Sequence, residues 1–435
     1  MKLFKFLTAI ALACVGGAGA RADVWSLDSC VAYAIEHNIN VRQSVINARQ
    51  SRVELTSAKN AFLPQVQGFA SQNFSFGRGL TAENTYADRN TSSFAAGAQL
   101  SMPIFSGLRN LRTKQRAETS LLAVLERSEA AKDDVSLNVM ALYLQALYAS
   151  EMVTVNRLNL NISRDELARR NALLEAGKIA ELDVYEARAQ VSRDELSLVN
   201  AANDSVLAVL DLSQTLNLPE GVIIEPSPLQ AEYGPVMSAQ EVWQAANSIN
   251  HAVRADNLDV RAAEQAVSVA KTGWIPTLSF NAGLSTNYYR TTGFNNESFG
   301  SQMRHNFAQS LGFSLSVPIF DAFGTRNNVR RARLQHESAI LALENTRLNL
   351  RKAIEQSHAQ AVAAAKKQIA AETAAESAAK AFEAMQVKYD HGRATPTEFA
   401  KAKTDYMTAL SEQVQAKYET ILRTRILTFY ARGRE

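Results

Sequence analysis

The sequence has 435 residues, of which 46% are hydrophobic and 20% charged, a composition that indicates a folded protein and excludes a disordered chain. Its 46 Lys and Arg residues nearly balance 43 Asp and Glu residues, which excludes the basic excess typical of nucleic-acid-binding proteins. Only two cysteines are present, so a framework of disulfide bonds is also excluded.

The first 22 residues have the pattern of a secretory signal peptide. Lys2 and Lys5 precede an apolar stretch at 7–15, and Ala20-Arg21-Ala22 resembles a cleavage site between small residues. An alternative is lipidation at Cys14 instead of cleavage after Ala22. No later stretch of 18 apolar residues occurs, so we expect any membrane-spanning part of the mature chain to consist of β-strands.

Long stretches of the chain lack both glycine and proline, the two residues that most often interrupt helices. Within them, apolar residues recur in steps of three and four, as at Leu137, Met140, Leu144 and Leu147. This spacing predicts long helices that bury one face against neighbouring helices. The uninterrupted stretches are 108–176, 178–218, 236–272 and 325–391.

More than half of the aromatic residues lie in two other segments, 62–105 and 274–323, where apolar and polar residues alternate. The alternation predicts strands at about 63–76, 92–103, 276–289 and 307–318. Alternation over about ten residues is typical of transmembrane β-strands, and the alternative is a soluble sheet that packs on one face. In the transmembrane interpretation, one phenylalanine on each strand faces lipid, namely Phe74, Phe94, Phe280 and Phe313.

The chain contains an internal tandem duplication. Residues 97–106 match residues 312–321 at six of ten positions, and the same offset of 215 aligns 177–184 with 392–399. We therefore expect a first repeat at 23–218, an irregular linker that is neither long helix nor strand at 219–240, and a second repeat at 241–435. Each repeat is expected to run helix, strand, strand, very long helix, return helix.

The two repeats have equivalent turns between their long helices. Gly177 and Gly392 are placed to end the helices in a left-handed conformation. Asp183 and Glu398 follow six residues later, where a carboxylate stabilises the first turn of the returning helix. That structural role and a role in gating are both open at this point.

Four strands in one chain cannot close a membrane barrel, because single-chain barrels begin at about eight strands. Cyclic assembly of identical chains solves this problem, and three copies would supply twelve strands. The sequence therefore predicts a mixed α and β fold in which each chain contributes four strands to a trimeric barrel, with long coiled helices continuing from it.

The sequence resembles the TolC-type outer-membrane efflux channel family. The resemblance rests on the duplicated plan, on the opening segment Trp25-Ser-Leu-Asp-Ser-Cys-Val-Ala-Tyr-Ala-Ile-Glu-His-Asn38, on two Pro-Ile-Phe motifs after Met102 and Val317, and on the two Gly-x5-Asp/Glu turns. It implies a homotrimer with a twelve-stranded barrel in the outer membrane and a long helical tunnel in the periplasm. It also implies a periplasmic adaptor and an inner-membrane pump of the RND or ABC type as partners.

The resemblance also implies a gate where the tunnel closes. By position, Asp183, Glu398 and Tyr389 match gate residues of the family, whereas Lys401 stands where the family has a second acid and Ala394 where it has a basic residue. We expect Lys401 to contact Glu398 through an i, i+3 pair. In a trimer, six clustered carboxylates from the two acids should raise some of their pKa values.

The same resemblance places the adaptor-docking grooves at the two helix turns. The residues concerned are Leu173, Leu174, Gly177, Lys388 and Gly392.

The sequence favours a passive duct over an enzyme. Its six histidines are scattered, and it has no P-loop, so we expect neither a catalytic site nor a cofactor nor a bound metal. The predicted function is the exit duct of a tripartite efflux or secretion system that carries small molecules, or proteins, out of the periplasm. The alternatives are a periplasmic or surface coiled-coil protein and an adhesin, neither with channel activity.

Overall fold

The computed structural model describes residues 23–80, 84–219, 222, 224–229 and 236–434. The expected signal peptide at 1–22, including Cys14, lies outside these residues, as do parts of the expected linker at 219–240. The chain forms two compact units, each assembled from distant segments. The first comprises described residues from Met1–Gln43, Ala131–Ile249 and Arg351–Glu435, and the second comprises those from Ser44–Ala130 and Asn250–Leu350.

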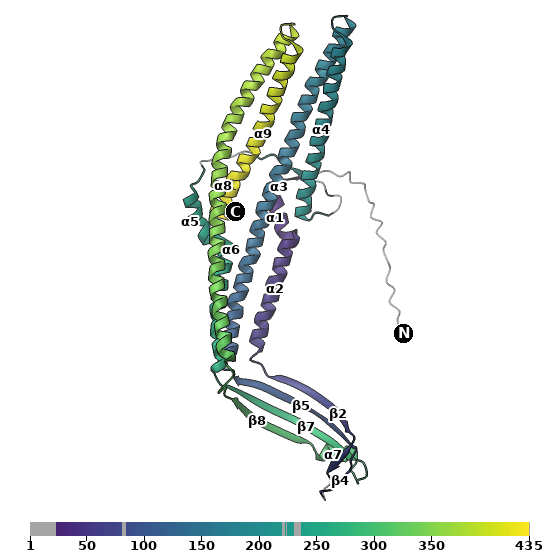
Figure 1. Ribbon diagram of the computed structural model, residues 1–435, viewed down its shortest axis with the longest axis vertical. Coiled ribbons are helices and arrows are strands. Elements are labelled where there is room, and N and C mark those ends of the chain that lie inside the picture. Colours follow the sequence, from purple (N-terminus) through teal and green to yellow (C-terminus); the bar gives the residue numbers. More distant parts are fainter. Residues whose placement is uncertain (1–22, 81–83, 220–221, 223, 230–235, 435) are drawn as a thin grey trace, which may run out of the picture. The chain divides into compact units, whose positions relative to one another are not determined.

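Two helical hairpins dominate the first unit, although the long first helix of each hairpin begins in the second unit (Figure 1). In one, α3 (Arg109–Glu175) is followed by α4 (Glu181–Leu216), and in the other α8 (Gly324–Asp390) is followed by α9 (Pro396–Arg432). α3 and α8 have 67 residues each, so each is roughly 100 Å long at a rise of 1.5 Å per residue. The long helices predicted from the missing glycines and prolines are confirmed.

None of the described helices combines the length and the apolar character that crossing a membrane requires.

The turns of the two hairpins have the same backbone geometry. Gly177 and Gly392 have φ values of 68° and 69°, the left-handed conformation in which a side chain is strained. In the first turn the Gly177 N–H donates to Leu174 O at 2.8 Å, and in the second the Gly392 N–H donates to Tyr389 O at 3.0 Å. The N–H of the residue after each glycine, Lys178 or Arg393, donates to the carbonyl oxygen of Leu173 or Lys388. This second hydrogen bond completes a Schellman motif. The duplication is thus visible in the hydrogen bonds.

A small core of the first unit lies around the first described residues. α1 (Leu27–His37) belongs to it, together with a parallel pair of short strands, β1 (Asp23–Trp25) and β6 (Ile224–Pro226). The short helix α5 (Ala239–Ile249) packs against α9 instead. The Tyr143 hydroxyl lies 2.9 Å from the carbonyl oxygen of Trp25, and it is fully buried.

The expected linker is therefore partly wrong, because residues 224–226 form a strand. This strand exists through pairing with β1, some 200 residues earlier in the chain, and a local pattern of prolines does not encode such pairing.

A four-stranded antiparallel sheet forms much of the second unit. Its strands are β2 (Gln65–Ser75), β5 (Thr91–Phe105), β7 (Thr277–Thr291) and β8 (Ala308–Ser316), in the spatial order β2-β5-β7-β8. The β5–β7 pair joins the two repeats at the middle of the sheet (Figure 1).

The second unit also contains the first parts of α3 and α8 and several shorter elements. The shorter elements are α2 (Ile39–Asn60), which begins in the first unit, α6 (His251–Ala270), the 3-10 helix η1 (Lys271–Trp274), α7 (Phe299–His305) and the short hairpin of β3 (Arg78–Leu80) and β4 (Tyr86–Asp88).

Strand β5 continues two residues beyond the expected end at 103. Pro103 lacks an N–H, but β2 pairs with β5 only as far as Ser101. Beyond that point β5 has β7 alone as a neighbour, so proline is tolerated there, and the register shifts between Pro103 and Phe105.

Candidate functional site

The strand register gives the sheet one apolar face and one polar face. Phe94 lies opposite Tyr288, and Phe280 lies opposite both Met102 and Phe313. Because residues opposite each other project to the same side, the apolar positions of all four strands share one face. The opposite face is mostly small and polar, with members such as Gln67, Ser71, Gln99, Ser101, Ser279, Asn281, Ser310 and Ser314.

All four predicted lipid-facing phenylalanines belong to the apolar face. Phe74 and Phe313 are 59% and 73% exposed in the single chain. Phe280 is half-buried, with its ring centroid 5.3 Å from that of Phe313. Phe94 is half-buried as well, because Phe299 of α7 lies over it at a centroid distance of 5.8 Å. The sequence did not predict α7, whose seven residues are too few to show a helical period.

The end of the second hairpin contains a cluster of aromatic side chains. Tyr389, at 7% exposure, stacks on Phe399 with ring centroids 4.7 Å apart. Phe382 contacts Phe399 at 5.6 Å and stacks on Tyr406 at 5.5 Å. Tyr389, the expected gate aromatic, is therefore held inside its own chain by packing.

Polar groups of α3 complete this cluster. The Tyr389 hydroxyl donates to Glu166, whose carboxylate also accepts from Arg170 Nε at 2.6 Å. The guanidinium carbon of Arg169 lies 4.0 Å from the centre of the Tyr389 ring, and its Nη1 is 3.0 Å from Asp390. Burial, followed by the hydrogen bond to Glu166, raises the pKa of Tyr389. Sequence reasoning missed these α3 residues, because their partners come from the other repeat.

The two predicted acids both lie in the first turn of a return helix. The Ala180 N–H donates to Asp183 Oδ2 at 3.2 Å, and the Thr395 N–H donates to Glu398 Oε2 at 2.7 Å. The Thr395 hydroxyl donates to the same Glu398 oxygen at 2.8 Å. These hydrogen bonds to Thr395 lower the pKa of Glu398 in the single chain, whereas clustering of carboxylates was expected to raise it.

Lys401 does not contact Glu398, which corrects the expected i, i+3 pair. Its Nζ lies 2.7 Å from Asp405 Oδ2 instead. Both residues are exposed, and the lysine extends toward the next turn of α9 rather than back toward Thr395.

The residues expected to dock an adaptor lie at the two turns. Gly177, Lys388 and Gly392 are exposed, and Leu173 and Leu174 are half-buried. The two leucines contribute carbonyl oxygens to the turn hydrogen bonds.

A buried polar network links the two hairpins further from the turns. Lys403 Nζ of α9 lies 2.9 Å from Asp194 Oδ2 of α4 and contacts Ser163 of α3. The exposures of the three residues are 7%, 5% and 5%. Asp194 also accepts from Asn159 Nδ2 at 3.0 Å, so its charge is well satisfied. An isolated lysine among polar residues gives no sequence signal for such a position.

No group of three or more His, Cys, Asp or Glu side chains that could hold a metal ion occurs among the described residues.

Comparison with known proteins assigns the fold and the family. The sequence profile of the family described as "Outer membrane efflux protein" matches residues 31–218 and 242–429, once for each repeat. The outer membrane efflux protein BepC of Brucella suis is 22% identical over 93% of this chain and 84% of its own length. Protein CyaE of Bordetella pertussis is 24% identical over 95% of this chain and 85% of its own length.

A solved structure of CusC has the same fold, with a TM-score of 0.78 at 16% identity, over 97% of this chain and 96% of CusC. The mixed α and β fold and the internal duplication expected from the sequence are thereby confirmed. Channels of this family are trimers that work with adaptor and inner-membrane pump proteins. The chain belongs to the outer membrane efflux protein family, and it is an outer-membrane exit duct of tripartite efflux or secretion systems, with a large helical portion in the periplasm.

Proposed function

We propose that three copies of this chain close a single twelve-stranded barrel and form a passive duct. The observation that carries this proposal is the open sheet. Among the described strands, β2 and β8 each pair with one neighbour only, so both edges expose unpaired N–H and C=O groups. In a membrane such groups need partners, and pairing of β8 with β2 of the next copy supplies them.

The two faces of the sheet support the same arrangement. The face with Phe74, Phe94, Phe280 and Phe313 matches lipid, and the small polar face matches a water-filled lumen. Closing three sheets with the apolar face outward satisfies both surfaces. A signal peptide at 1–22 and two repeats, at 23–218 and 241–435, belong to the same proposal.

The hairpin turns form the end of the duct that meets the other components. An adaptor docks at the grooves beside Leu173, Gly177, Lys388 and Gly392, with Leu174 supporting the first turn. Asp183, Glu398 and Lys401 line the gate near this end, and Tyr389, which is buried in its own chain, supports the gate from behind. The exposure of both glycine turns supports docking there, because exposed backbone at a turn is accessible to a partner.

The duct performs no chemistry of its own. Transport energy comes from an inner-membrane pump of the RND or ABC type, and the cargo is small molecules or proteins.

The molar mass of the purified protein in detergent, after subtraction of bound detergent, tests the trimer. A monomer or a dimer contradicts it. Planar-bilayer recordings on the same sample test the duct, and a trimer without stepwise conductance contradicts channel activity while leaving the assembly intact.

A further inference from the structure

A pocket lies where the strands of the second unit meet the helices. It has a volume of about 590 Å³ and is lined by parts of α3, α6, η1 and α8. Thr277 and Ser316, which pair in the sheet, line its strand end, and both lie on the small polar face. Every lining residue belongs to the second unit of one chain, so the pocket does not depend on the proposed trimer.

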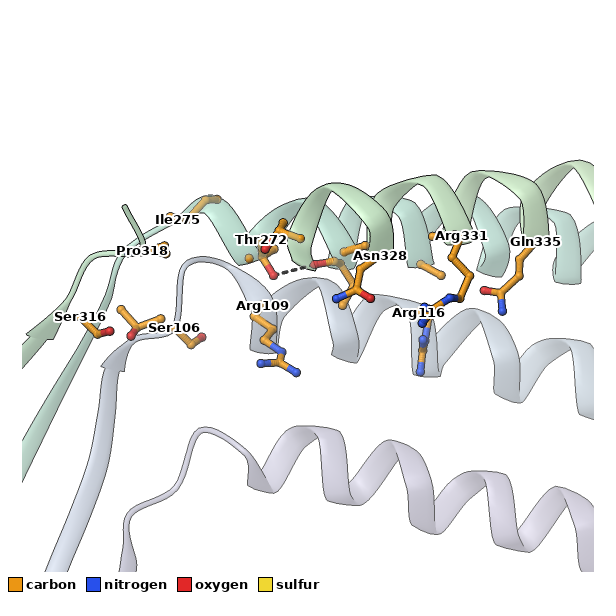
Figure 2. Close-up of a pocket in the computed structure, with 17 residues that line it drawn as sticks. Ser106, Arg109, Arg116, Thr272, Ile275, Ser316, Pro318, Asn328, Arg331 and Gln335 are labelled. Atoms are coloured by element: carbon orange, nitrogen blue, oxygen red, sulfur yellow. Dashed lines mark hydrogen bonds between the residues drawn. The ribbon is translucent and has the colours of Figure 1, made fainter. Parts of the chain in front are cut away.

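Three arginines line this pocket and no acid does. They are Arg109 and Arg116 of α3 and Arg331 of α8 (Figure 2). Arg109 and Arg116 are seven residues apart, about two helical turns, so they lie on the same side of α3. Figure 2 shows Arg331 extending from α8 toward Arg116. The internal repeat relates these two arginines, since their positions differ by the offset of 215.

The three arginines have no counter-ion in the part of the chain that the structure describes. Among the residues that the structure describes, none of the three guanidinium groups has an ion pair or a hydrogen bond. Neither 106–117 nor 322–336 contains an acidic residue. The nearest preceding acid, Asp321, already accepts the Thr325 N–H at 2.6 Å and caps α8. The three arginines are exposed, so solvent screens much of their mutual repulsion, and an anion bound between them would remove the rest.

We propose that Arg109, Arg116 and Arg331 form a binding site for a phosphate-type oxyanion. Guanidinium groups bind phosphate oxygens through paired, charge-assisted hydrogen bonds. A doubly charged oxyanion balances most of the three positive charges, whereas a singly charged ion balances one. The phosphate belongs either to a soluble anion in the duct or to a lipid headgroup at the membrane edge, and both sources present the same oxygens.

Isothermal titration with inorganic pyrophosphate, on protein in a neutral detergent, tests the soluble source. The double variant Arg116→Gln/Arg331→Gln should raise the Kd about a hundredfold, because each lost charge-assisted contact costs about tenfold. The matched control is Arg330→Gln/Arg333→Gln, which removes the same charge from exposed residues of α8 that do not line the pocket. Its Kd should rise less than about threefold, through long-range charge alone.

Native mass spectrometry from nanodiscs tests the lipid source. Retention of phosphatidic acid, whose phosphate is a monoester that can carry two negative charges, but not of phosphatidylcholine, by the wild type and the control, with loss in the pocket variant, assigns a lipid phosphate. Pyrophosphate binding with the same dependence assigns a soluble phosphate. Binding in neither arm, or equal weakening by the pocket and control variants, overturns the proposal.

Discussion

The two hairpin turns share a backbone and differ in the side chains around it. Both use a left-handed glycine and the same pair of backwards hydrogen bonds. The second turn then adds a full capping box, with the Thr395 hydroxyl accepting the Glu398 N–H at 3.2 Å and Pro396 starting the helix. At the equivalent place the first turn has Ala180, which offers no side-chain cap.

The side chains that pack behind the second turn are also larger than those behind the first. The aromatic cluster of Phe382, Tyr389, Phe399 and Tyr406 lies behind the second turn. With the repeat offset of 215, the equivalent residues of the first hairpin are all aliphatic, namely Leu167, Leu174, Val184 and Val191. The duplication therefore preserved the geometry of the chain reversal, while only one copy acquired the larger and partly polar contacts.

The largest expected effect comes from the buried pair that joins the hairpins. Lys403→Met leaves Asp194 charged and buried, so it should lower the free energy of unfolding by about 3–5 kcal/mol. The pair has no counterpart, because the equivalent residues are Arg188 and Ala409. Urea titration at fixed protein concentration measures the change.

The exposed Arg188 supplies the control for this comparison, and Arg188→Met should change stability by less than about 0.5 kcal/mol. The double variant Lys403→Met/Asp194→Leu should recover most of the loss, because it removes both charges. Equal stability of Lys403→Met and Arg188→Met would show that the pair contributes nothing.

Tyr389→Phe is the next largest change. It keeps the stacking on Phe399 and removes the hydroxyl that donates to Glu166, so we expect a loss of about 1–2 kcal/mol. Tyr185 belongs to the first hairpin and is 58% exposed, which makes Tyr185→Phe the matched control with little effect. The same titration checks both variants, and equal effects would contradict the asymmetry between the hairpins.

Substitution of the turn glycines tests what the two hairpins share. An added Cβ meets no atom within 4 Å at either Gly177 or Gly392, so only the backbone conformation opposes it. Gly177→Ala and Gly392→Ala should each cost roughly 1–2 kcal/mol, and the two costs should agree. A clearly larger loss of stability at one turn would mean that the hydrogen bonds shared by the two turns do not determine how much each glycine contributes.

The sequence predicted the parts of this fold that local rules determine. Missing glycines and prolines indicated α3 and α8, and alternation indicated the four long strands. The order β2-β5-β7-β8 and the single apolar face needed the register between strands that are far apart in the sequence. The offset of 215 already related Gly177 to Gly392 and Arg116 to Arg331.

The sequence could not indicate site residues whose partners lie in the other repeat. Glu166 and Arg169 are ordinary charged residues of a helix until Tyr389 of α8 lies beside them. Likewise, the role of Lys403 becomes evident only from its contact with Asp194. Lys401 was assigned the wrong partner because i, i+3 and i, i+4 contacts are equally available to a long side chain on a helix.

The smallest effect concerns the capping box that only the second turn has. Hydrogen bonds from Thr395 lower the pKa of Glu398 below its ordinary value of 4.5. A carboxyl whose pKa is lowered by folding stabilises the native state above the unfolded pKa, and this contribution disappears as pH falls through the folded pKa.

The difference in Tm between wild type and Glu398→Gln should therefore stay constant from about pH 7 to pH 5 and shrink below about pH 4.5. In a Thr395→Ala background the difference should be smaller at every pH, since the hydroxyl that donates to Glu398 is gone while the backbone N–H of residue 395 still donates. If the six carboxylates of a trimer instead repel one another across a narrow gate, Glu398→Gln should stabilise the protein at neutral pH, and that gain should fall as the acids become protonated. The sign of the Tm difference at pH 7 thus separates a helix cap from a charged gate ring.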